Sequence, residues 1–177
     1  IAERLLFHRA ENIVADPVMT ATSGGRLMQN STEGVLIREL LPLARIITPN
    51  IPEAEILSGI KITTQDDMLE AARIIAKLLK GDILLKGGHL QDTSDDLLFT
   101  GGEAVWFRGP HIENSNTHGT GCTLSSAIAC GLAEGLSVRD SVTKAKEFIT
   151  GAIADGLDLG SGSGPLNHMY RLPFRFG

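Results

Sequence analysis

Short apolar runs of strand length alternate with longer segments of helical periodicity along most of this chain, and this alternation leaves few fold classes open. Buried strands are predicted at residues 12–16, 44–48 and 82–86, with amphipathic helices between and after them. Consecutive parallel strands need a crossover, which is usually a helix. We therefore expect an α/β fold in which a mostly parallel sheet carries helices on both faces, within a single domain over residues 1–177.

Local signals predict where the helices begin and end, because small polar residues can accept hydrogen bonds from the first turn of a helix. A further segment, residues 97–112, alternates in polarity and is interrupted by Gly101-Gly102, which predicts a β-hairpin. The first predicted helix covers residues 31–41 with Ser31 as cap, and the start of the second is bracketed by Pro49 and Pro52, with its end near Gly59. The third covers residues 64–81, with Thr64 and Asp67 as a cap and Gly81 as the end. Two more helices are predicted, one that begins at GTGC and one capped by Ser137 with Asp140.

The charge and composition of the chain limit the kinds of molecule that we expect it to bind. The net charge is −5 and no dense run of Lys or Arg occurs, which argues against nucleic acid and against anionic membranes. The sequence contains no apolar run of the roughly 20 residues that span a bilayer, and its first residues do not have the order of a signal peptide, so we expect a cytoplasmic protein that acts on small molecules. Cys122 and Cys130 are about 12 Å apart on one predicted helix, which predicts two free thiols.

Four loops follow predicted strands or open a helix, and they carry most of the reactive residue types. They are DPVM from Asp16, TPNIPE from Thr48, KGGH from Lys86 and HGTGC from His118. In open α/β sheets, ligands bind outside the carboxyl ends of the strands. The chemistry of this protein is therefore expected in these loops.

The HGTGC segment has the composition of an anion site. Gly119 and Gly121 allow the backbone to turn tightly before an apolar helix and to direct several N–H groups at one point, although an ordinary glycine-rich turn has the same local pattern. Cys122 lies in the first helical turn, where the helix dipole lowers the pKa of a thiol, so it is a candidate base. Cys130 is expected to be an inert thiol of the core.

The remaining candidates each have a structural alternative. Asn50 and Glu53 are three residues apart at a helix start, so they can form a capping box or face a ligand. Asp16 can cap the turn at Pro17 or face the crevice, and Lys86 is either a phosphate contact or an exposed turn lysine. Mg²⁺ prefers one or two carboxylates with water and phosphate oxygens, so Asp16 and Glu53 would suffice for a nucleotide-bound metal.

Six motifs in order give the chain a family resemblance: DPVM, SGG at residues 23–25, LLPLARIITPNIPEAE, LLKGGHL, NTHGTGCTLSSAIA and GSGSGPLNH. Over nearly its whole length the chain resembles the hydroxymethylpyrimidine and phosphomethylpyrimidine kinases of the ribokinase superfamily. The resemblance implies a ribokinase-like fold, ATP and Mg²⁺ as cofactors, and two successive phosphorylations of a pyrimidine alcohol in thiamine biosynthesis. The implied roles are Asp16 and Glu53 at the metal, Thr48, Asn50, Glu53 and Lys86 at the nucleotide, Gly119, Thr120, Gly121 and Cys122 as the anion hole with Cys122 as base, and Val18 with Cys122 at the pyrimidine.

The chain departs from the family at two places. Members carry a further segment before the position that matches Ile1, including a glycine-rich loop that supplies much of the pyrimidine pocket, so we expect this chain to keep the nucleotide side and lack most of the acceptor side. Thr22 stands where members usually have a lysine. A pyridoxal kinase and a nucleotide-binding module without turnover are the alternatives. The sequence does not decide the oligomeric state, and a homodimer is one assembly that we consider.

Overall fold

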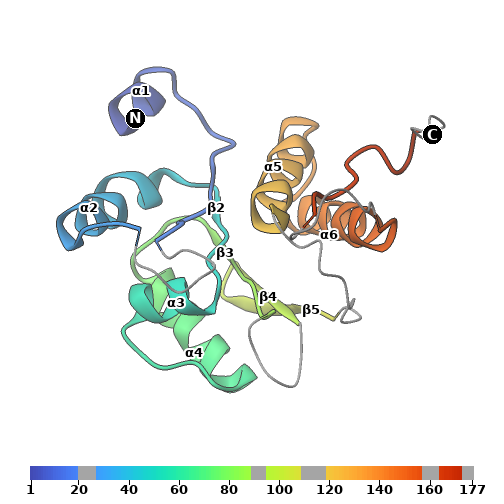
Figure 1. Cartoon of the computed structure of the whole chain (residues 1–177). Helices are drawn as coiled ribbons and strands as arrows, with labels where there is room; N and C mark the ends of the chain where they lie inside the picture. Colours follow the sequence, from blue (N-terminus) through green and yellow to red (C-terminus); the bar gives the residue numbers. More distant parts are fainter. Residues whose placement is uncertain (20–26, 89–94, 109–118, 157–163, 173–177) are drawn as a thin grey trace. The chain divides into compact units, whose positions relative to one another are not determined.

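The computed structural model describes residues 1–19, 27–88, 95–108, 119–156 and 164–172. The chain divides into two compact units, Ile1–Gly109 and Pro110–Gly177, which we call the sheet unit and the helical unit. The sheet unit contains the five-stranded sheet together with α1 to α4, and the helical unit contains α5 and α6 (Figure 1).

The sheet is mixed, with strand order β1-β2-β3-β4-β5. Three short strands pair in parallel: β1 (Val14–Ala15), β2 (Ile46–Ile47) and β3 (Asp82–Leu85). An antiparallel hairpin of β4 (Asp96–Thr100) and β5 (Glu103–Phe107) completes the sheet. Gly101 and Gly102 form its turn with φ of 58° and 86°, a region that favours glycine. The α/β class and the hairpin are thereby confirmed, and two of the four strand pairings are parallel.

Helices of the sheet unit follow the predicted order with two corrections at their ends. They are α1 (Ala2–Phe7), α2 (Asn30–Val35), which continues as a π-helical turn η1 (Leu36–Leu40) and a 3₁₀ turn η2 (Leu41–Leu43), α3 (Ile51–Ser58) and α4 (Gln65–Ala76). The prediction of Ser31 as a cap is wrong, because α2 begins one residue earlier and Ser31 lies inside it. Helix α4 ends at Ala76 rather than near Gly81, although its predicted capping box of Thr64 and Asp67 is present.

The core of the sheet unit lies against one face of the sheet. Strand residues Ile47, Ile83 and Leu85 point to this face and pack against Met68, Ala72 and other buried side chains of α3 and α4. Because successive side chains of a strand alternate, Ile46 and Leu84 point to the opposite face, and both are fully buried. Apolar residues on both faces are typical of a sheet that is covered on both sides.

The helical unit consists of α5 (Thr120–Ala133), α6 (Val138–Ala154) and a returning segment, residues 164–172. The predicted apolar stripes are confirmed by the buried side chains Leu124, Ile128, Leu132, Val138, Val142, Ala145, Ile149 and Ala152. Ser137 caps α6 and accepts a bond from the Asp140 backbone, as predicted. Gly151 allows the Tyr170 ring to lie directly on α6, since a side chain at this position would overlap the ring. The returning segment is thus packed against α6.

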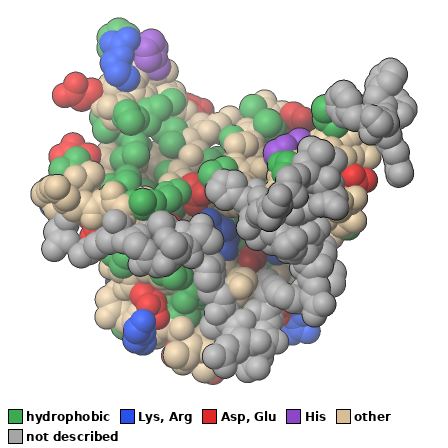
Figure 2. Space-filling model, viewed as in Figure 1, with side chains coloured by type: hydrophobic (Ala, Val, Ile, Leu, Met, Phe, Trp, Pro, Cys, Tyr) green, Lys and Arg blue, Asp and Glu red, His purple; other side chains and the backbone are tan. Residues whose placement is uncertain are grey.

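Apolar side chains also lie at the surface of the sheet unit. Figure 2 shows hydrophobic groups over the region of α1 and α2, where Leu6, Phe7 and Val35 are exposed. Among the described residues, no helix is both long and apolar enough to span a bilayer.

Candidate functional site

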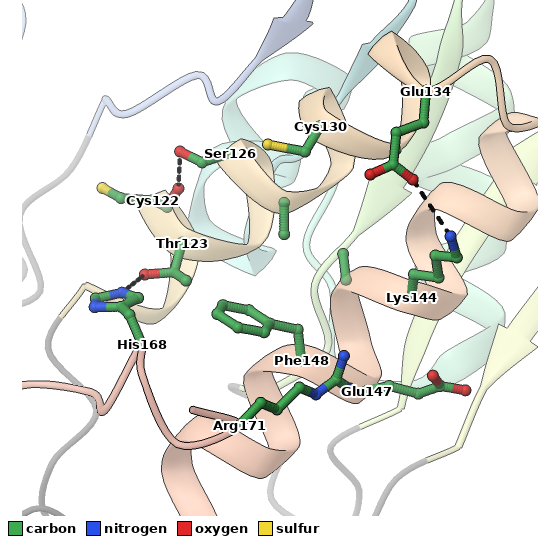
Figure 3. A pocket seen from close by; sticks show the side chains of 13 residues that line it. Cys122, Thr123, Ser126, Cys130, Glu134, Lys144, Glu147, Phe148, His168 and Arg171 are labelled. Carbon is green, nitrogen blue, oxygen red and sulfur yellow. Dashed lines mark hydrogen bonds and ion pairs between the residues drawn. The ribbon is translucent and has the colours of Figure 1, made fainter. Parts of the chain in front are cut away.

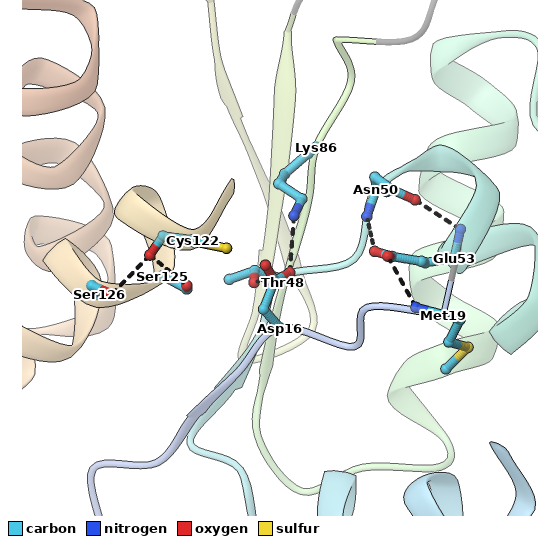
Figure 4. Close-up of polar contacts among 9 residues, drawn as sticks. All are labelled: Asp16, Met19, Thr48, Asn50, Glu53, Lys86, Cys122, Ser125 and Ser126. Atoms are coloured by element: carbon cyan, nitrogen blue, oxygen red, sulfur yellow. Dashed lines mark hydrogen bonds and ion pairs between the residues drawn. The ribbon is translucent and has the colours of Figure 1, made fainter. Parts of the chain in front are cut away.

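Three polar side chains meet where the parallel strands end, as the sequence predicts. Asp16 follows β1, Thr48 follows β2 and Lys86 follows β3. Lys86 Nζ lies 2.9 Å from Asp16 Oδ1, and the Thr48 hydroxyl donates to the same oxygen over 3.0 Å (Figure 4). The Asp16 and Lys86 side chains are only 14% and 17% exposed, and Thr48 is fully buried. This partly desolvated ion pair is the centre of the first group.

The backbone around Lys86 is held by contacts with both neighbouring segments. Its N–H donates to the Pro49 carbonyl over 2.8 Å, and Asn50 and Lys86 form an isolated parallel bridge. The next residue, Gly87, donates its N–H to the buried Asp96 carboxylate over 2.9 Å. A Cβ on Gly87 would collide with the Asp95 carbonyl, so glycine is required for this close approach. The ammonium of Lys86 is therefore carried by a constrained loop.

Asn50 and Glu53 form the capping box of α3, which confirms the structural alternative for this pair. The Asn50 side chain accepts from the Glu53 N–H and the Glu53 carboxylate accepts from the Asn50 N–H, both over 2.9 Å. The other carboxylate oxygen accepts from the Met19 N–H over 3.4 Å, so Glu53 also ties the loop after β1 to α3. Burial raises the pKa of Glu53, which is 1% exposed, and the Lys86 charge partly opposes that rise.

The second group opens α5 in the helical unit. Gly119 is the N-cap with φ of 84°, and Thr120, Gly121 and Cys122 form the first turn. The N–H groups of a first helical turn have no partner within the helix and carry the positive end of its dipole. Cys122 is exposed, and its carbonyl accepts from the hydroxyls of Ser125 and Ser126 over 3.0 and 2.7 Å.

A cavity of about 660 Å³ lies between α5, α6 and the returning segment. Cys122 and Thr123 line one end, and the ion pair of Glu134 with Lys144 lies at the other (Figure 3). Cys130 also lines this cavity and is exposed, so the prediction of an inert core thiol is wrong. Cys130 lies beside the buried face of α5 that holds Leu124, Ile128 and Leu132, at the cavity that Ala145 and Phe148 of α6 also line. The prediction that both cysteines are free thiols is confirmed.

The predicted site residues thus fall into two groups. The sheet unit holds Asp16, Thr48, Asn50, Glu53 and Lys86 at the carboxyl end of the sheet, and Val18 is 41% exposed in the loop after β1. The helical unit holds the residues of the first turn of α5. Thr22, His118 and the SGG segment lie outside the described residues.

Sequence reasoning missed two features of these groups. One is the Met19 N–H at Glu53, and the other is a hydrogen bond of 2.9 Å between Thr123 Oγ1 and His168 Nε2. The GSGSGPLNH motif contains His168, so the motif match was the available signal for the second feature.

The donor set determines which metals these residues could hold. Among the described residues, no group of three His, Cys, Asp or Glu side chains could hold a metal ion by itself. Asp16 and Glu53 offer two carboxylates near a lysine, which fits Mg²⁺ completed by water and phosphate oxygens.

Comparison with known proteins identifies the family. Residues 1–167 match the family model of phosphomethylpyrimidine kinase. The chain belongs to this family. It is 46% identical over 170 residues to the thiamine biosynthesis bifunctional protein ThiED of Geobacter sulfurreducens, covering 96% of this chain and 35% of that protein. It is 43% identical over 159 residues to the hydroxymethylpyrimidine/phosphomethylpyrimidine kinase of Streptomyces coelicolor, covering 90% of this chain and 59% of that kinase.

The solved structures confirm the ribokinase-like kinase fold that the resemblance implies. An ADP complex of Bacillus subtilis pyridoxal kinase superposes with a TM-score of 0.85 at 36% identity, over 96% of this chain and 64% of that one. The chain therefore spans less than two thirds of the length of each of these three proteins.

Proposed function

We propose that this family member, as part of its full-length gene product, transfers the γ-phosphoryl group of ATP to hydroxymethylpyrimidine and then to hydroxymethylpyrimidine phosphate, in thiamine biosynthesis. The observation that carries the proposal is the meeting of Asp16, Thr48 and Lys86 at the carboxyl ends of three parallel strands, in a chain of this kinase family. The partners of this reaction are small molecules.

The first group suits the nucleotide side of this reaction. Asp16 and Glu53 would hold Mg²⁺, which neutralises phosphate charge when it is bound. Lys86 now pairs with Asp16, so a metal at that carboxylate would free the ammonium to contact the nucleotide phosphates. Thr48 and Asn50 would line the same crevice. The buried capping box keeps Glu53 in a fixed orientation.

The second group suits the transferred phosphoryl group. The N–H groups of Thr120, Gly121 and Cys122 would stabilise the charge on its equatorial oxygens, as preorganised backbone dipoles do in other acyl and phosphoryl transfers. Cys122 would act as the base that takes the proton of the substrate hydroxyl while that oxygen bonds to phosphorus and ADP leaves. Val18 would contact the pyrimidine.

A pyridoxal kinase is the second candidate, because the structure of the Bacillus subtilis pyridoxal kinase covers 96% of this chain with a TM-score of 0.85. Initial rates with Mg-ATP and either hydroxymethylpyrimidine, its monophosphate or pyridoxal, measured on the full-length gene product, distinguish the two. A higher kcat/KM for the two pyrimidines supports the proposal. A higher kcat/KM for pyridoxal contradicts it, and nucleotide binding without any turnover would favour a binding module.

The role of Cys122 has its own test. A positioned base contributes about 10²–10⁴-fold, and the loose transition state of phosphoryl transfer places the loss for Cys122→Ala near 10²-fold in kcat. Cys122→Asp should recover part of this activity. Cys130→Ala is the matched control, since Cys130 is also an exposed thiol on α5. Equal kcat for Cys122→Ala and the parent, under conditions where chemistry limits turnover, would remove the base from the mechanism.

A further inference from the structure

A side chain of the returning segment contacts a side chain in the first turn of α5, within the helical unit. His168 Nε2 lies 2.9 Å from Thr123 Oγ1, and Thr123 is the fourth residue of α5. The two residues are 45 positions apart, so the contact depends on the fold of the helical unit and not on local sequence. This contact joins His168, the last residue of the GSGSGPLNH motif, to the first turn of α5, which the proposed function uses as an anion hole.

The direction of this hydrogen bond is linked to the other bond of Thr123 and to the tautomer of His168. The Thr123 hydroxyl lies 2.9 Å from the Gly119 carbonyl, to which it can donate. A hydroxyl has one hydrogen, so Oγ1 accepts from His168 when that hydrogen points at Gly119. This arrangement requires the tautomer of His168 that carries its proton on Nε2. A donor at a hydroxyl oxygen polarises that hydroxyl and strengthens the bond it donates onward, which here ends at Gly119.

The Gly119 carbonyl is thereby held by two donors of one residue. Both the Thr123 N–H and the Thr123 hydroxyl donate to it over 2.9 Å. In a planar trans peptide the C=O and the following N–H point in opposite directions. Fixing the carbonyl of Gly119 therefore fixes the direction of the Thr120 N–H, which belongs to the proposed anion hole.

The His168 ring is itself held in place. It stacks on Phe148 of α6 with a centroid distance of 6.4 Å and an interplanar angle of 26° (Figure 3). The turn that carries it is anchored by the Asn167 side chain, which donates to the Asp155 carboxylate over 2.7 Å. The Met169 N–H in turn donates to the Asn167 side chain over 3.0 Å. An exposed histidine with a stacked ring and an anchored backbone has little freedom to leave Thr123.

We propose that His168 is a positioning residue: it donates to Thr123 and so orients the peptide between Gly119 and Thr120, whose N–H faces the phosphoryl group being transferred. This inference rests on the proposed function for the role of that N–H. The hydrogen-bond relay from His168 to Gly119 can be measured whether or not the protein phosphorylates a pyrimidine.

Four variants of the full-length gene product test the relay. His168→Leu removes the donor, whereas His168→Gln keeps an N–H near the position of Nε2. Thr123→Val removes the hydroxyl at nearly constant volume. Met169→Ala is the matched control, because it shortens the neighbouring side chain on the same turn and leaves the relay intact.

The first measurement is independent of activity. In ¹⁵N–¹H spectra, we expect the Thr120 amide resonance to move in His168→Leu and Thr123→Val, and to return toward its parental position in His168→Gln. We also expect the parental His168 to be protonated on Nε2. A Thr120 resonance in His168→Leu that matches the parent, with Met169→Ala as reference, would overturn the relay.

The second measurement separates kcat from KM with Mg-ATP and hydroxymethylpyrimidine. Removing a whole anion-hole donor costs about 10²–10³-fold, so misdirecting one should lower kcat by about 10-fold. We expect the KM for ATP to stay within about 2-fold and His168→Gln to restore most of kcat. The double variant His168→Leu/Thr123→Val should have a kcat no lower than that of Thr123→Val alone, because both changes act on one relay.

The outcomes distinguish the two hypotheses. A parental protein without phosphotransfer refutes the proposed function, while the Thr120 resonance still decides the relay. An active parent whose kcat is unchanged in His168→Leu refutes the positioning role. Equal losses in His168→Leu and His168→Gln would do the same, because they would reflect packing on Phe148 and not the donated proton.

Discussion

Replacing Lys86 by methionine tests whether the Asp16–Lys86 pair stabilises the sheet unit. The two side chains are 17% and 14% exposed, so water cannot fully replace the lost ammonium at the Asp16 carboxylate. The Thr48 hydroxyl would remain as a donor to that carboxylate. A hydrogen bond to a charged group contributes about 1.5–3 kcal/mol, and breaking a fully buried pair costs about 3–5 kcal/mol. For this partly buried pair we expect Lys86→Met to lower the free energy of unfolding by about 2 kcal/mol.

Trp106 provides the assay, because it is the only tryptophan of the chain and packs against the core of the sheet unit from β5. Its fluorescence during urea denaturation follows the unfolding of this unit. Lys61→Met is the matched control: Lys61 lies 2.7 Å from Glu55 in the same unit, but its side chain is 85% exposed. Such an exposed pair contributes at most about 1 kcal/mol.

A double-mutant cycle with Asp16→Asn isolates the pairwise contribution. We expect a coupling free energy of about 1–2 kcal/mol between Asp16 and Lys86. If Lys86→Met costs no more than Lys61→Met, or if the cycle gives no coupling, burial does not strengthen this pair and the reasoning is refuted.

Two further predictions concern the loop after β3 and the start of α4. Gly87→Ala should destabilise the sheet unit by about 3 kcal/mol in the same Trp106 assay, because the new Cβ meets the Asp95 carbonyl, whereas Gly88→Ala should be well tolerated because nothing lies within 4 Å of its Cβ. Hydrogen bonds from Thr63 and Thr64 lower the pKa of Asp67 to about 2, so its contribution to stability is present above the ordinary value of 3.8 and is lost as the pH falls toward 2. Asp67→Asn should remove that part of the acid dependence. A loss of unfolding free energy on acidification that is as steep in this variant as in the parent or in the control Asp66→Asn would contradict the assignment.

The sequence by itself determined the features that depend on a few neighbouring residues. The capping boxes at Asn50 and Thr64 join groups three positions apart, and the Gly101-Gly102 turn needs positive φ at adjacent residues. The stripes of α5 and α6 follow from helical periodicity. Even this local information was insufficient at Ser31, because several adjacent polar residues can cap a helix and the packing of Leu36 and Ile37 on the core helps to select the start.

Only the tertiary structure decided which of these residues meet. The Asp16–Lys86 pair joins residues 70 positions apart, and the bond from Met19 to Glu53 spans 34. The predicted sheet placed Asp16, Thr48 and Lys86 at the ends of its strands, along one edge. The periodicity of the sequence does not specify that Thr48 and Lys86 both contact Asp16 Oδ1. The spacing of residues along the sequence likewise did not predict that Cys130 is exposed or that His168 and Thr123 form a hydrogen bond. Such contacts depend on how packed helices and strands bring distant segments together, and a pattern of period two or 3.6 reports only which face of its own element a side chain occupies.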